Sequence, residues 1–113
     1  MKYIFSEPSQ YSFKDVNGHH GKFFGTESPL TNHLIVECEE KLTVSLIQHK
    51  SEFTYYILEG DGYFTINNRR QPVTRGDLAV IPPNTKYTFG GRLKMLLINT
   101  PHYSPDQEEI IGE

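Results

Sequence analysis

Between residues 31 and 99 the chain alternates short apolar runs with clusters of turn-forming residues. The runs are rich in Val, Ile, Tyr and Phe, and Gly, Pro, Asn and Asp separate them. Short β-branched and aromatic runs with such punctuation are typical of a sandwich or barrel of strands. Because no segment keeps a helical period for several turns, we predict an all-β fold.

We place the strands on the apolar runs and the turns between them. The predicted strands cover residues 33–37, 41–49, 53–58, 63–66, 71–73, 78–81, 87–89 and 93–99. Turns are expected at residues 59–62 and 90–91, which are rich in glycine. Another is expected at Asn67 and Asn68, because asparagine tolerates the positive φ of a tight hairpin. Pro82 cannot donate to a ladder and therefore marks the end of a strand.

The two ends of the chain differ from this core. Residues 1–30 form an irregular extension, in which aromatic residues stand among turn formers and one or two short strands are expected. Residues 101–113 form an acidic tail with a helical turn after its second proline. We therefore expect one domain over residues 1–113, with the barrel core at residues 31–100.

Length, charge and cysteine content narrow the function. With 113 residues and a net charge of −3, the chain lacks the concentrated basic face of a nucleic-acid binder. Its longest apolar runs are too short to cross a bilayer, so no membrane partner is expected. The single cysteine, Cys38, excludes an internal disulfide and a multi-cysteine zinc site. No secretory segment is recognised at the N-terminus, and we expect a cytoplasmic protein.

Two stretches of the chain carry a family resemblance. The first reads Tyr-Tyr-Ile-Leu-Glu-Gly-Asp-Gly and ends at Gly62, and the second reads Gly-Asp-Leu-Ala-Val-Ile-Pro-Pro-Asn and begins at Gly76. Together with the interval between them, these stretches resemble the cupins, a family of small jelly-roll β-barrels. The resemblance implies a cupin jelly-roll fold. The family usually has glycine at the position of Asn84, and asparagine preserves such a turn because it tolerates a left-handed backbone.

The resemblance also implies where a metal would lie, since the two cupin motifs supply its ligands. Counted back from Gly60, the ligand positions of the first motif fall on Phe53, His49 and Ile47. Counted from Gly76, that of the second motif falls on Tyr87, so His49 is the only motif ligand that this chain keeps. One imidazole does not hold a catalytic metal, which usually needs three or more protein ligands. We therefore predict no cofactor. A divalent metal held by unusual ligands, with His33 as a further candidate, is the alternative.

A small-molecule site is predicted in the mouth of the barrel. If His49 faces inward, period-2 alternation brings Ile47 to the same face, while Tyr55 and Tyr87 face them from other strands. The predicted catalytic groups are His49, Tyr55 and Tyr87, an imidazole and two phenols suited to acid–base chemistry. The predicted substrate-binding residues are Ile47, Phe53, Ile57, Phe89 and Arg75, mostly apolar as in small-molecule pockets. His19 and His20 lie between two glycines and are interpreted as an exposed loop.

Three functions remain open. The first is a metal-independent isomerase-, epimerase- or lyase-like enzyme that acts on a small polar or sugar-type substrate through His49 and a tyrosine, by analogy with metal-free cupins that act on nucleotide-linked sugars. The second is a non-catalytic ligand-binding or sensory cupin, and the third is a metal-dependent cupin with unusual ligands. A homodimer is expected, because residues 93–98 are apolar on both faces except at Lys94.

Overall fold

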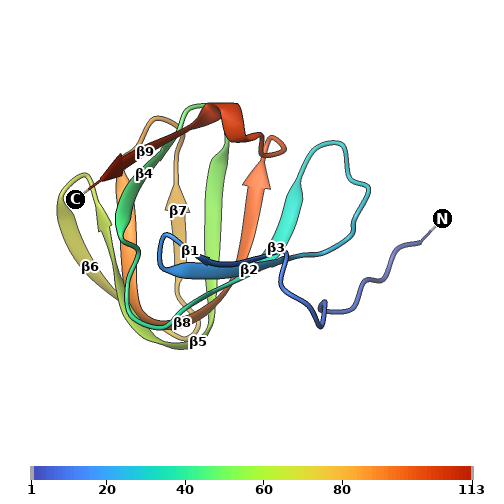
Figure 1. Cartoon of the computed structure of the whole chain (residues 1–113), viewed down its shortest axis with the longest axis horizontal. Helices are drawn as coiled ribbons and strands as arrows, with labels where there is room; N and C mark the ends of the chain where they lie inside the picture. Colours follow the sequence, from blue (N-terminus) through green and yellow to red (C-terminus); the bar gives the residue numbers. More distant parts are fainter. Residues whose placement is uncertain (1, 113) are drawn as a thin grey trace.

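The alternating apolar runs form one curled sheet in the computed structural model, which describes residues 2–112 (Figure 1). The strands are β1 (Phe13–Val16), β2 (His19–Phe23), β3 (Asn32–Cys38), β4 (Val44–Gln48), β5 (Glu52–Ile66), β6 (Arg69–Thr74), β7 (Leu78–Ile81), β8 (Tyr87–Thr100) and β9 (Glu108–Gly112). The only regular helix within these residues is the short 3-10 turn η1 (Pro105–Gln107). The predicted all-β fold is confirmed. No helix in this described part of the chain is long and apolar enough to span a membrane.

Strand β8 holds the sheet together because it pairs with three other strands. It runs antiparallel to β5 along its whole length and to β3 along its second half, and it meets β4 at Tyr87. On one side the sheet continues through β3 and β2 to β1, and on the other through β4 to β9. Strands β6 and β7 pair with β5. This curled antiparallel arrangement is the jelly roll that the sequence predicts.

Two predicted turns are wrong, because the chain continues as strand through both of them. Residues 59–62 lie within β5 and residues 90–91 lie within β8. The glycines there serve a close approach of the two strands. A Cβ on Gly62 would lie 2.2 Å from the carbonyl oxygen of Gly90, and a Cβ on Gly60 would lie 1.8 Å from that of Arg92. A bulge between Ile57 and Glu59 shifts the register at the same place.

Other local predictions are confirmed. Asn67 and Asn68 have φ values of 50° and 67° and join β5 to β6 in a two-residue hairpin. Asn84 has a φ of 64°, which supports the turn inferred in place of a glycine. The helical turn expected in the tail is η1. The strand that follows it, β9, was not predicted, and it pairs with β4.

The interior of the barrel has two parts. One end is packed with large apolar side chains, among them Ile57, Phe64, Phe89 and Met95, each no more than 1% exposed. The Phe64 and Phe89 rings lie 5.2 Å apart between centroids. The other end, beneath β1 and β2, holds a cavity. On the outer face the apolar side chains of β8 are only half-buried, and the expected homodimer through this face stays a prediction.

Candidate functional site

The cavity at the second end of the barrel has a volume of about 190 Å³. Most of its wall is apolar, formed by side chains such as Phe23, Leu34, Val36, Phe53 and Leu97. Six polar residues also line it: Asn17, His19, Tyr55, Asn99, Tyr103 and Glu108. An apolar cavity with a few convergent polar groups is the usual form of a small-molecule site.

The β1–β2 hairpin positions His19 in this wall. Its two-residue turn, Asn17 and Gly18, has positive φ at both positions, as a type I′ turn requires. The turn docks on the loop before β4, where the Thr43 amide donates a hydrogen bond of 2.9 Å to the Asn17 carbonyl. A Cβ at position 18 would lie 2.1 Å from the Lys41 carbonyl oxygen, so only glycine allows this approach. The interpretation of His19 as part of an exposed loop is therefore wrong.

The His19 imidazole is held as a neutral base. Its Nδ1 lies 2.5 Å from the Val16 carbonyl oxygen, which can only accept, so Nδ1 carries the proton. The lone pair is then on Nε2, which has no hydrogen-bond partner among the described residues. Burial lowers the pKa of His19 below its usual 6.5. The ring also packs edge-on against Phe13 and Phe89.

Tyr55 and Tyr87 join the cavity to the packed end. Their hydroxyls are 2.9 Å apart and fully buried. Burial raises the pKa of Tyr55 well above its usual value of 10, and the neighbouring Tyr87 adds to this. Burial also raises the pKa of Tyr87, although hydrogen bonds from Tyr55 and Gln48 oppose it. Both phenols therefore stay protonated at neutral pH and act as hydrogen-bond donors.

Glu108, the first residue of β9, supplies the carboxylate of the cavity wall. The Gln48 amide donates a hydrogen bond of 2.7 Å to its Oε2. Burial and the adjacent Glu108 charge raise the pKa of Tyr103 to about 12, so Tyr103 is a third protonated hydroxyl. The wall thus offers two groups that can act as a base, the Glu108 carboxylate and the His19 Nε2.

The structure brings together only some of the predicted site residues. Phe53 and Tyr55 line the cavity, and Tyr87 reaches it through Tyr55. Ile57 and Phe89 are buried in the packed end instead of the cavity wall.

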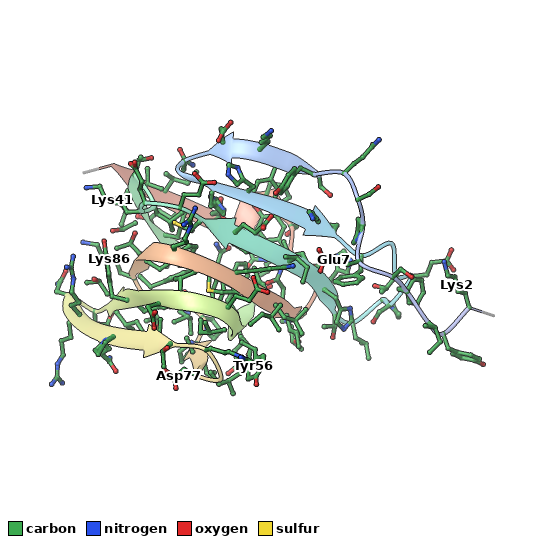
Figure 2. All side chains as sticks on the ribbon, turned by 90° about the horizontal axis from the view of Figure 1, so that it is seen from below. Lys2, Glu7, Lys41, Tyr56, Asp77 and Lys86 are labelled. Atoms are coloured by element: carbon green, nitrogen blue, oxygen red, sulfur yellow. The ribbon has the colours of Figure 1, made fainter. Side chains whose placement is uncertain are left out.

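Four other predicted site residues, with His49 among them, lie outside the cavity. His33 faces a surface groove beside Phe24 and Leu96. Ile47 lies on the outward face of β4, and Arg75 is exposed in the turn before β7. In Figure 2, Asp77 of that turn is on the opposite side of the molecule from the blue β1–β2 hairpin.

The inward orientation considered for His49 is wrong. The buried alternation on β4 runs through Val44, Leu46 and Gln48, which places His49 just beyond the strand with its side chain 47% exposed. Its Nδ1 lies 2.7 Å from Asn84 Oδ1 and its Nε2 lies 3.0 Å from Glu109 Oε1. These hydrogen bonds raise its pKa. A one-residue difference in register moves a side chain to the other face of a strand, and Gln48 takes the interior position.

The interior does not fit the metal centre that the family resemblance implies. Leu46, Gln48, Phe53 and Tyr87 occupy the inward positions on the strands that would carry ligands. Alkyl and amide side chains are poor ligands for iron, manganese or zinc. A phenol coordinates iron after it loses its proton, and burial opposes this by raising the pKa of Tyr87. Within residues 2–112 no group of three or more His, Cys, Asp or Glu side chains is arranged to hold a metal ion.

The residues missed by sequence reasoning left signals of different strength. Leu93, Met95 and Leu97 alternate along one strand, and Asn99 takes the next position of the same face. The alternation therefore predicts that Asn99 points inward. The turn at Asn17 and Gly18 signals the hairpin of His19. Tyr103 and Glu108 carry no such pattern, because only the tertiary course of the tail brings them to the barrel.

The fold and its interior cavity place the chain among small jelly-roll barrels. The chain belongs to the cupin family, because the family model for the cupin domain matches residues 35–99. An uncharacterised protein of Methanocaldococcus jannaschii is 39% identical over 67 residues, a match covering 56% of this chain and 54% of the relative. The chain thus matches about half the length of that curated relative.

Solved structures reproduce nearly the whole fold. A histidine-to-glutamine variant of Streptomyces PAC13 with uridine is 26% identical, with a TM-score of 0.88, and covers 98% of this chain and 92% of its own. Pac13, a nucleoside dehydratase, is 24% identical in another structure, with a TM-score of 0.90 over 99% of this chain and 92% of that one. KdgF from Halomonas is 14% identical, with a TM-score of 0.78 over 92% and 97%.

Proposed function

We propose that this cupin is a metal-independent acid–base enzyme of the lyase or isomerase type, acting on a small sugar-bearing molecule such as a nucleoside. The observation that carries the proposal is the neutral His19 imidazole in one apolar cavity with the Glu108 carboxylate and the Tyr55 hydroxyl. The likeness to PAC13 with uridine supports the substrate class. His19 takes the part that the sequence assigned to His49.

The geometry suits proton abstraction next to a carbonyl. The His19 Nε2 accepts the proton from carbon, and the electron pair moves toward the carbonyl oxygen to give an enolate. The Tyr55 hydroxyl, held by Tyr87, donates a hydrogen bond to that oxygen as its charge grows. The imidazolium then returns the proton to another atom, which is an isomerisation. Alternatively, the enolate expels a β-hydroxyl that takes the proton and leaves as water, which is an elimination.

Deuterium exchange tests this proposal without knowledge of the product. The protein is incubated in D2O with nucleosides, their aldehyde or keto derivatives and keto sugars, and mass spectrometry follows deuterium gain or loss of water. We expect catalysed exchange or elimination with at least one of these compounds. His19→Gln should reduce the rate by roughly 10²- to 10⁴-fold.

His49→Gln is the matched control, because His49 lies outside the cavity, and it should keep the full rate. A large loss in that variant with none in His19→Gln would overturn the assignment. Binding without exchange by any compound would favour the ligand-binding or sensory alternative. Loss of exchange on chelation, with restoration by a divalent ion, would favour the metal-dependent alternative.

A further inference from the structure

Asn99 is a buried amide without a partner. It is only 2% exposed, it lines the cavity, and its Oδ1 accepts no hydrogen bond within the described part of the chain. Its Nδ2 donates no hydrogen bond to any of the described residues either. Since both ends of the amide are unbonded, exchanging the nitrogen and oxygen assignments would not change this result. Buried polar groups are almost always hydrogen-bonded, so such an exception needs an explanation.

The neighbouring asparagine, Asn32, differs from Asn99 because both ends of its amide have partners. Asn32 is directly opposite on β3, in register with Asn99 of β8. Its Oδ1 accepts a hydrogen bond from the Tyr103 amide, and its Nδ2 contacts His102 Nε2 at 3.0 Å. Gln48, another buried amide, is anchored through its Nε2 to Glu108. The Oε1 of Gln48, like the Oδ1 of Asn99, accepts no hydrogen bond within the described residues, but the bond of its Nε2 holds the Gln48 side chain in place. Asn99 has no such anchor on either end of its amide.

The surroundings of Asn99 define what it would recognise. A carboxamide offers an acceptor and a donor side by side, and the matching group is an N–H next to a C=O. Leu34, Phe53 and Leu97, all part of the same cavity wall, offer apolar surface to a flat ring. Leaving Asn99 unpaired costs free energy in the empty protein, and a ligand that pairs with it regains that free energy on binding.

We propose that Asn99 is the specificity-determining residue of the cavity and reads the amide or imide edge of a heterocyclic base. The proposal rests on the proposed function in that it concerns the same cavity, but it requires binding alone. Uridine carries an imide edge. In 3-methyluridine a methyl group replaces the imide proton, and in ribose the base is absent. These three compounds are therefore the probes.

Isothermal titration of the full chain with each probe tests the proposal. The protein should bind uridine at least about tenfold more tightly than 3-methyluridine, the effect of roughly one good hydrogen bond. Ribose should bind more weakly still. Asn99→Leu should weaken uridine binding by a similar factor and bind uridine and 3-methyluridine equally. Asn99→Val serves as a second variant if Asn99→Leu fails to fold.

The melting temperature distinguishes this proposal from a purely structural role for Asn99, because the two predict changes in opposite directions. Asn99→Leu should keep or raise the melting temperature, because it removes an unpaired buried amide, whereas Asn32→Leu should lower it. The proposal is overturned if the protein does not bind uridine or does not discriminate against 3-methyluridine. It is also overturned if Asn99→Leu binds like the unmodified chain, or loses stability as Asn32→Leu does. His19→Gln should reduce the rate of exchange and keep the discrimination between uridine and 3-methyluridine, so the two proposals fail separately.

Discussion

The two ends of the barrel interior are built from the same strands but differ in character, since one is packed and the other holds a cavity. In the packed end, the apolar side chains of Phe64, Phe89 and Met95 fill the space inside the curled sheet. In the cavity end, β5 and β8 contribute the polar residues Tyr55 and Asn99. The β1–β2 hairpin adds His19, and β9 adds Glu108. Along β8 the inward alternation runs unbroken from Tyr87 to Asn99, whereas in β5 the bulge after Ile57 shifts it by one residue. Stability and binding are thus separated along the strands, and a buried polar group left unpaired in the cavity, such as the Asn99 amide, costs stability.

The largest effect should come from opening the packed end. Phe64→Ala removes a ring that contacts Tyr55 and Phe89 at 5.2 Å between centroids, and it should cost roughly 3–5 kcal/mol of unfolding free energy. Phe53→Ala, in the cavity wall, should cost less because one side of that ring already faces open space. Urea denaturation measures both variants. Equal losses would mean that the two ends are packed alike.

An intermediate effect is expected where the two ends meet, at the tyrosine pair. Tyr55→Phe and Tyr87→Phe each remove one hydroxyl and leave the other buried without this partner, at about 1–2 kcal/mol apiece. The double variant should cost clearly less than the sum, because it removes both groups at once. The same denaturation series gives the coupling. Additive losses would show that the hydrogen bond contributes nothing to folding.

The smallest effect is the pH dependence that separates a cavity histidine from a surface histidine. The pKa of His19 is lowered on folding, so its contribution to stability is complete above its unfolded pKa of about 6.5 and is lost as the pH falls. The pKa of His49 is raised, so its contribution is complete below that value and is lost as the pH rises through the folded pKa.

Melting temperatures at a series of pH values measure this difference. His19→Gln should flatten the loss of stability as the pH falls. His49→Gln should lower stability below the folded pKa of His49 and flatten the loss as the pH rises through it. Because His49 is exposed, its effect should be the smaller one and should fade in high salt. A steeper acid limb in His19→Gln would contradict the buried neutral imidazole.

The barrel was predictable from the sequence, and the composition of its site was predictable only in part. The family motifs placed Phe53 and Tyr87 inward, and because side chains on one face repeat every second position, the inward orientation of Tyr55 and Phe89 followed. The face of His49 depended on a count of residues through the loop before β5, and one residue decides it. The turns at the glycines of β5 and β8 were mispredicted because glycine serves close strand contact as readily as reversal. Glu108 reaches the cavity because β9 pairs with β4, and no local sequence pattern predicts this pairing.

The position of His19 has a consequence for how this scaffold acquires new chemistry. It sits on β2, and only β1 lies between β2 and that edge of the sheet, whereas the barrel strands carry the packing. Under the proposed function, a few substitutions in this peripheral hairpin add, remove or replace the base and leave the barrel intact. Cupins that share the barrel and differ in this hairpin are then expected to differ in the reaction they catalyse.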